Sequence, residues 1–163
     1  MYQAKIKIML GKNNTNNKPL IKINMIAMMI DKQLSNNFWL SEFNFVVPEP
    51  DLLKVLQYVR DYMGPVNITS STRTIEQHIK IYKDLYKDEW IDKIPWKSRH
   101  LPAFERGLRA VDITVKDKIG LEIAQVCEVA AKKYDILLGL GTGIRFVHLD
   151  IDRERQVRWT YKY

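Results

Sequence analysis

This sequence has few of the residues that cross-link small domains, and it has no long apolar run. Its single cysteine, Cys127, excludes an intrachain disulfide and a cysteine-rich metal site. The longest apolar stretch near the start covers residues 25–30, whereas a membrane span needs roughly 20 residues. The first 17 residues turn polar after Leu10 and lack a small-residue cleavage site. We therefore expect neither a secretion signal nor a transmembrane segment.

Histidine is also scarce, and the charge is unbalanced toward the positive side. The 163 residues include 3 histidines, 26 lysines and arginines and 19 acidic residues, which gives a net charge of +7. Such a charge favours anionic partners, such as nucleic acid, a membrane surface or an anionic polymer. Lysine and arginine are spread along the chain, so an ordinary soluble basic surface explains the charge equally well.

The composition changes along the chain and suggests its organisation. Residues 1–37 are rich in asparagine, lysine and methionine, with a polar run at 13–17, and we interpret them as an N-terminal basic and polar arm. Residues 38–163 are long enough for one domain with a real core.

Three helices are predicted in this domain. The first begins at Pro50 and ends at Gly64, and its apolar residues recur every three or four positions: Leu52, Leu56, Val59 and Met63. The second follows Thr74, because Gln77 stands at the spacing of a capping box. The third covers about 120–134 and carries Cys127 in an apolar run, which indicates a buried, unreactive thiol.

Short strands are predicted at 66–69, 110–115, 136–140, 146–151 and 157–161. Alternation in the second strand places Asp112 and Thr114 on one face, with the apolar residues on the other. The glycine-rich run at 139–143 is followed by a strand and not by a helix, so we interpret it as a turn, not a phosphate loop. The order of elements predicts an α+β fold: a small antiparallel sheet with flanking helices.

Two of the histidines and one aspartate form the most informative set in the chain. His100 precedes Asp112 by 12 positions, and His148 lies on a predicted strand near the end of the chain. Two imidazoles and one carboxylate suffice for a zinc site that keeps one position open. His78 has no such context, and we interpret it as a packing or surface residue.

Four segments of the chain resemble a known family. The matching residues are Ser98, His100, Ala110 and Asp112 in a first motif, and Phe146, Val147 and His148 in a second. Residues 40–43 and 68–73 resemble the family's entry segment and its arginine loop. Over residues 38–161 the chain thus resembles the zinc peptidases of bacterial cell walls: D-alanyl-D-alanine carboxypeptidases and phage endolysin peptidases.

The resemblance implies a role for each site residue. His100, Asp112 and His148 would bind Zn²⁺ in a cleft on the sheet. Zinc lowers the pKa of a bound water and polarises a scissile carbonyl. Arg73 would bind a peptide carboxylate or stabilise the oxyanion, with a structural salt bridge as the alternative. Ser98 and Ser70 would contact substrate or line the cleft.

The chain departs from the family in two places. His100 and Asp112 stand further apart than usual, and residues 102–106 are interpreted as an insertion that a loop can absorb. Arg145 occupies the position where many members have the catalytic carboxylate. Other members have an aspartate after the last histidine, and Asp150 matches them as the proton acceptor. Its alternative is support of a neighbouring residue, with Asp152 and Glu105 as weaker options for the base.

The leading hypothesis is therefore a zinc metallopeptidase acting on peptidoglycan peptides, of the kind found in phage lysis. It would stay in the cytoplasm until release or travel with the virion. The alternative is a catalytically impaired cell-wall-binding or phage structural protein with the same fold. A basic nucleic-acid-binding domain is supported by charge alone, so no specific nucleic acid is expected. The bond that is cut and the oligomeric state stay open.

Overall fold

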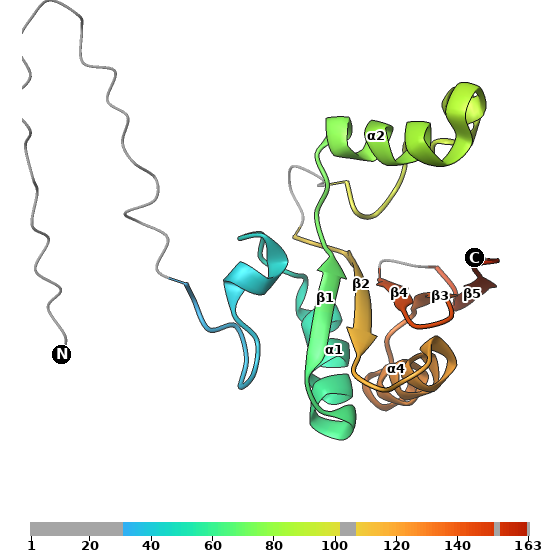
Figure 1. Cartoon of the computed structure of the whole chain (residues 1–163). Coiled ribbons are helices and arrows are strands. Elements are labelled where there is room, and N and C mark those ends of the chain that lie inside the picture. Colours follow the sequence, from blue (N-terminus) through green and yellow to red (C-terminus); the bar gives the residue numbers. More distant parts are fainter. Residues whose placement is uncertain (1–30, 102–106, 152–153, 163) are drawn as a thin grey trace, which may run out of the picture. The chain divides into compact units, whose positions relative to one another are not determined.

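A five-stranded sheet is the centre of the folded part of the chain (Figure 1). The computed structural model describes residues 31–101, 107–151 and 154–162. The strands are β1 (Val66–Ser70), β2 (Ala110–Val115), β3 (Gly139–Thr142), β4 (Val147–Asp150) and β5 (Val157–Thr160). They are arranged in the order β1-β2-β4-β3-β5. All neighbours are antiparallel except β3 and β5, which are parallel. The predicted α+β class is confirmed.

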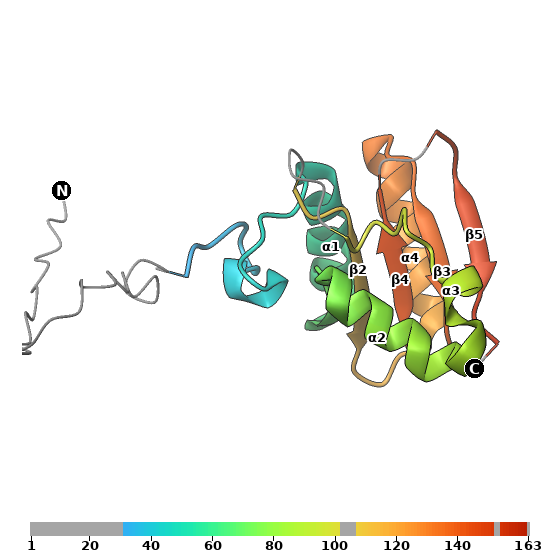
Figure 2. The ribbon, with the colours of Figure 1, turned by 90° about the horizontal axis from the view of Figure 1, so that it is seen from above.

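Helices lie on both faces of this sheet. Helices α1 (Pro50–Met63) and α4 (Gly120–Tyr134) pack against each other and cover one face. Helix α2 (Ile75–Tyr86) lies on the opposite face, followed by η3 (Lys87–Glu89) and α3 (Trp90–Lys93) (Figure 2). A short 3-10 helix, η2 (Leu40–Phe43), precedes α1. Among the described helices, none has the length and apolar character of a membrane span.

The helix boundaries follow the local signals in the sequence. The Thr74 hydroxyl accepts a hydrogen bond from Gln77 N at 3.2 Å, and Gln77 Oε1 accepts one from Thr74 N at 2.8 Å. This is the predicted capping box at the start of α2. Pro50 stands in the first turn of α1, and Gly64 ends that helix at a φ of 89°, where glycine has no steric penalty.

The core lies between the sheet and the α1–α4 pair. Val111 and Ile113 of β2 and Leu149 of β4 are fully buried there, against helix residues such as Leu56. Cys127 of α4 is buried in the same core, and burial raises the pKa of its thiol to about 12, which agrees with an unreactive thiol. The opposite face of β2 therefore presents Asp112 and Thr114.

Residues 31–37 belong to the same compact unit as the sheet. The Ser35 hydroxyl donates to Gln57 Oε1 at 2.6 Å, and Asn37 Nδ2 donates to Asp61 Oδ1 at 3.2 Å. Both acceptors are on α1, so this segment contacts the helix at Ser35 and Asn37.

The glycine-rich segment corrects one prediction. Residues 139–142 form strand β3, paired with β4 and β5, and the turn begins only at Gly143, whose N–H donates to Phe146 O at 2.9 Å. Leu140 pairs with Leu149 on the core face, whereas Gly141 pairs with His148 on the other face. The run has strand alternation with glycine in place of polar side chains, and the turn interpretation was wrong because it considered only glycine's turn propensity.

We predict that Gly141→Ala destabilises the fold. An added Cβ would stand 2.5 Å from the Trp159 ring and 2.6 Å from the Tyr161 ring. Overpacking of this kind costs about 1–3 kcal/mol, so the midpoint of urea unfolding should fall. The control is a double-mutant cycle with Trp159→Ala. Gly141→Ala should lower the unfolding midpoint less in the Trp159→Ala protein than in the wild type, because one of the two rings is gone. An unchanged midpoint for the single variant would contradict this packing.

Candidate metal centre

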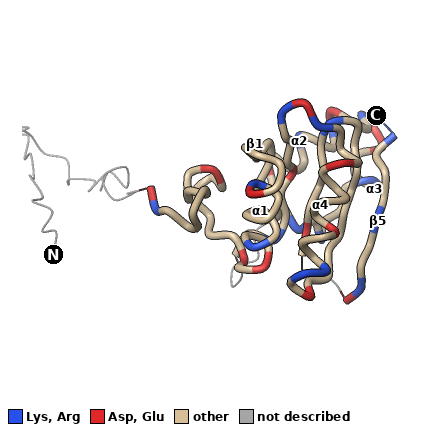
Figure 3. Tube along the Cα trace, turned by 90° about the horizontal axis from the view of Figure 1, so that it is seen from below, with Lys and Arg blue, Asp and Glu red and all other residues tan. Residues whose placement is uncertain are grey.

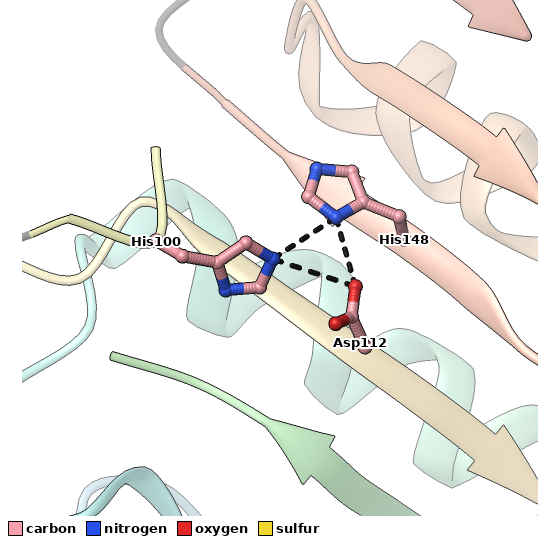
Figure 4. Close-up of side chains that lie close together, drawn as sticks. All are labelled: His100, Asp112 and His148. Atoms are coloured by element: carbon pink, nitrogen blue, oxygen red, sulfur yellow. Dashed lines mark hydrogen bonds and ion pairs between the residues drawn. The ribbon is translucent and has the colours of Figure 1, made fainter. Parts of the chain in front are cut away.

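Three side chains from separate elements converge on the face opposite the core (Figure 4). Asp112 of β2 and His148 of β4 are directly paired in the sheet. His148 Nδ1 lies 2.8 Å from Asp112 Oδ1, and His100 Nε2 lies 3.4 Å from the same oxygen. The two facing nitrogens, His100 Nε2 and His148 Nδ1, are 3.1 Å apart. Both imidazoles are buried.

His100 reaches this place from the loop that follows α3. Its carbonyl accepts a hydrogen bond from Arg73 N at 3.0 Å, and its Nδ1 lies 2.6 Å from the buried Ser71 carbonyl. The segment after β1 therefore holds the histidine by backbone and side chain. The wide spacing between His100 and Asp112 does not keep the two apart, although residues 102–106 lie outside the described part of the chain.

Each of the three side chains has one polar atom that faces the other two and one that faces away. The atom that faces away contacts a neighbouring group. The Ser71 carbonyl can only accept, so His100 Nδ1 carries the proton and Nε2 has the lone pair. His148 Nε2 lies 3.1 Å from Asp150 Oδ2, and the same reasoning leaves the lone pair on His148 Nδ1. Asp112 Oδ2 accepts from Arg73 Nη2 at 2.8 Å.

The inward atoms are therefore three acceptors that lie within 4.8 Å of one another. Three acceptors at such distances repel one another unless a cation lies between them, either a metal ion or a proton that His148 Nδ1 shares with Asp112 Oδ1. The group could hold a metal ion, and two imidazole nitrogens with one carboxylate oxygen are donors that divalent transition metals accept. The outer partners are those that orient metal ligands in proteins.

The electrostatics of the group agree with this arrangement. Burial opposes ionisation of Asp112, but the contacts with His100 and His148 outweigh it and lower the pKa of this carboxyl. Burial opposes protonation of His148, but the contacts with Asp112 and Asp150 outweigh it and raise the pKa of this imidazole. In the absence of a metal ion, the group thus favours a proton on His148.

Arg73 lies behind Asp112. Its Nε and Nη2 donate to the Ser70 hydroxyl at 3.1 and 3.0 Å, and Nη2 also reaches Asp112. Ser70, which the sequence placed at the site, thus contacts the group through Arg73. The Nη1 atom of Arg73 makes no hydrogen bond to any described residue, and Arg73 borders the cleft described below.

Asp150 lies on the far side of the His148 ring. The residue is 1% exposed, with Oδ2 against His148 Nε2 and Oδ1 3.7 Å from Arg99 Nε. The sequence suggested Asp150 as proton acceptor, with support of a neighbouring residue as the alternative. The contact with Nε2 is the geometry of the supporting role.

The structure describes three of the other residues that the sequence analysis named: Ser98, Arg145 and His78. Ser98 borders the cleft, and its Oγ accepts from His100 N at 3.4 Å. Arg145 is exposed between β3 and β4. His78 is buried, with Nε2 3.2 Å from Pro95 O, so it is a packing residue. Asp152 and Glu105 lie outside the described residues.

A cleft of about 480 Å³ opens over the three converging side chains. Helix α2 contributes Ile81, Tyr82 and Leu85 to its wall. Three aromatic residues line the other side: Phe146 directly before β4, Trp159 in β5 and Tyr161 directly after β5. The Trp159 ring lies over Gly141 and 5.3 Å from the His148 ring. The sequence analysis missed this aromatic wall. The alternation of Trp159 in β5 with Tyr161 directly after it was the available signal. That signal could not locate the two rings beside the centre without knowledge of the β3–β5 pairing.

No protein-family model, curated protein or solved structure matches this chain. The geometry of the centre and the resemblance of its motifs are therefore the basis for a functional proposal.

We predict that metal affinity falls as the pH is lowered. A proton and a metal ion compete for His148 Nδ1, and the pKa of His148 is raised from its ordinary value of 6.5. Affinity should therefore rise with pH through the ordinary histidine range and level off only above the raised pKa. Zinc titration against a competing chelator at several pH values measures this. An affinity independent of pH across that range would show that His148 is not a ligand.

Proposed function

We propose that this protein is a zinc-dependent peptidase that hydrolyses peptide bonds in the stem peptides or cross-links of bacterial peptidoglycan. The observation that carries the proposal is the set of three inward acceptors, His100 Nε2, His148 Nδ1 and Asp112 Oδ1, at the floor of an open cleft. The same residues carry the motifs that resemble cell-wall peptidases, so chemistry and sequence pattern coincide.

Zinc is the metal that the donor set favours. Two histidines and one carboxylate, without cysteine, are the ligands of hydrolytic zinc sites that keep a position open. Bound zinc would supply Lewis-acid chemistry, polarising a carbonyl and making water more acidic. The protein's own part is to hold His100, Asp112 and His148 in place and to bring the peptide to them.

The cleft offers groups for binding an anionic peptide. Arg73, Lys97 and Arg99 border the cleft. A guanidinium can bind a carboxylate or a carbonyl oxygen by directed hydrogen bonds, and stem peptides carry several carboxylates. Ser98 is placed to hydrogen-bond the peptide backbone. We propose that the protein acts on the wall after release from the cytoplasm or as part of a virion.

A second candidate is a cell-wall-binding or phage structural protein that has lost catalysis. The observation that favours it is the engagement of the carboxylates around the centre. Among the described residues that border the cleft, the carboxylates are Asp112 and Asp150, and each lies against a histidine. Nucleic-acid binding receives no such support, because basic and acidic residues are interspersed over the described elements (Figure 3).

We predict that the zinc-loaded protein releases peptides from purified peptidoglycan and that His148→Ala does not. Loss of one ligand should remove most zinc binding, because the remaining two donors form an incomplete site. Release of new amino and carboxyl ends measures cleavage, and His78→Gln is the matched control for loss of a histidine outside the centre. Zinc binding and co-sedimentation with the wall, without cleavage of any wall type, would replace the peptidase by the second candidate.

We predict that Arg73→Lys weakens both zinc binding and wall cleavage. The three donors of a lysine ammonium sit on one nitrogen, so they cannot reproduce the planar, separated N–H groups with which Arg73 reaches Ser70 Oγ and Asp112 Oδ2. Loss of an outer partner typically costs about 10- to 100-fold in affinity or activity. Arg155→Lys is the control, because Arg155 is exposed and lies in the segment between β4 and β5. Unchanged zinc affinity with unchanged cleavage would show that Arg73 has neither role.

A further inference from the structure

We propose that Asp150 is a positioning residue whose carboxylate, held beside Arg99, fixes the His148 ring so that Nδ1 is presented to the metal. This inference rests on the proposed zinc site. It assigns to Asp150 the supporting role instead of the role of proton acceptor. The following contacts carry it.

The first contact orients the ring. Asp150 follows His148 by two positions on β4, so both side chains lie on the same face of the sheet. Asp150 Oδ2 lies 3.1 Å from His148 Nε2. An ionised carboxylate only accepts hydrogen bonds, so this contact selects the tautomer with the proton on Nε2. The lone pair is then on Nδ1, the atom that faces Asp112 and His100.

The second contact holds the carboxylate. Arg99 Nε donates to the Ile151 carbonyl at 3.0 Å and lies 3.7 Å from Asp150 Oδ1. A buried carboxylate needs such a compensating charge. Arg99 precedes His100 in the sequence, so one loop delivers one proposed ligand and also anchors the group that orients the other.

The position of Asp150 is unsuited to taking a proton from water at the metal. A general base must lie within hydrogen-bond reach of the proton that it removes. Asp150 borders the cleft, but the residue is only 1% exposed and the His148 ring lies between Oδ2 and the converging atoms. A carboxylate on the outer nitrogen of a histidine instead makes the inner nitrogen a better ligand.

The first experiment compares zinc affinities by chelator competition, without substrate. Asp150→Asn keeps the size of the side chain but removes its charge, and zinc affinity should fall about 10- to 100-fold. The matched control is Asp135→Asn. Asp135 is exposed and ends α4 in a left-handed conformation, with a φ of 54°, that asparagine adopts readily. Its zinc affinity should equal that of the wild type.

The second experiment is imidazole nitrogen NMR, and its wild-type arm needs no variant. The zinc-loaded wild type should show the proton of His148 on Nε2 and none on Nδ1. In metal-free protein at a pH at which the imidazole is neutral, the wild type should keep the proton on Nε2, whereas in Asp150→Asn a tautomer with the proton on Nδ1 should become populated. A purely structural role for Asp150 would not change the tautomer, because it would act through folding alone.

Two results would overturn the inference. One is a wild-type spectrum with the His148 proton on Nδ1. The other is wild-type zinc affinity in Asp150→Asn together with loss of wall cleavage, which would make Asp150 the proton acceptor. The measurements of zinc affinity and of the His148 tautomer both omit substrate. A protein that shows the expected affinities and tautomer but cleaves no peptidoglycan would therefore leave this inference standing and remove the proposed peptidase.

Discussion

The pairing of β2 with β4 is the constraint on which the centre depends. In this antiparallel pair Val111 lies opposite Leu149 and Asp112 lies opposite His148. Strand alternation means that the apolar pair can enter the core only if the polar pair faces the cleft. A slip of one residue would expose Leu149 and bury Asp112. The free energy of core burial therefore also holds the aspartate and the histidine opposite each other.

The strand register positions Asp112 and His148, and further contacts position the rest of the centre. His100 comes from a loop, where backbone alone would leave it mobile, but two contacts with the segment at 71–73 fix it. Arg73 and Asp150 then hold the outer atoms of Asp112 and His148. Repulsion among the inward acceptors is thus opposed by partners on the outside. A site of this kind loses little entropy when a cation enters, because its ligands are already in place.

The sequence predicted those features that depend on local chemistry. The bounds of α1 and α4 follow from proline, glycine and apolar spacing, and the α2 cap follows from Thr74 and Gln77. The convergence of His100, Asp112 and His148 was predicted from the residues that surround them in the two motifs. Composition alone would not have supported that prediction. Strand β3 was partly missed because Gly139 and Gly141 have no side chains to show alternation. The parallel β3–β5 pair, the Arg73–Asp112 contact and the direction of Asp150 depend on long-range pairing that one sequence does not encode locally.

The two arginines beside the centre have a consequence for how the cleft would attract an anionic ligand. Arg73 is paired with Asp112 and Arg99 lies beside Asp150, so each carboxylate of the group has a positively charged partner. A divalent ion would displace the proton that His148 favours in the metal-free group and would make the cleft more positive. A bound ion is then the largest local charge and focuses the field in the cleft. An anionic ligand would then bind more strongly to the metal-loaded protein than to the metal-free protein, so the ion would affect encounter as well as chemistry.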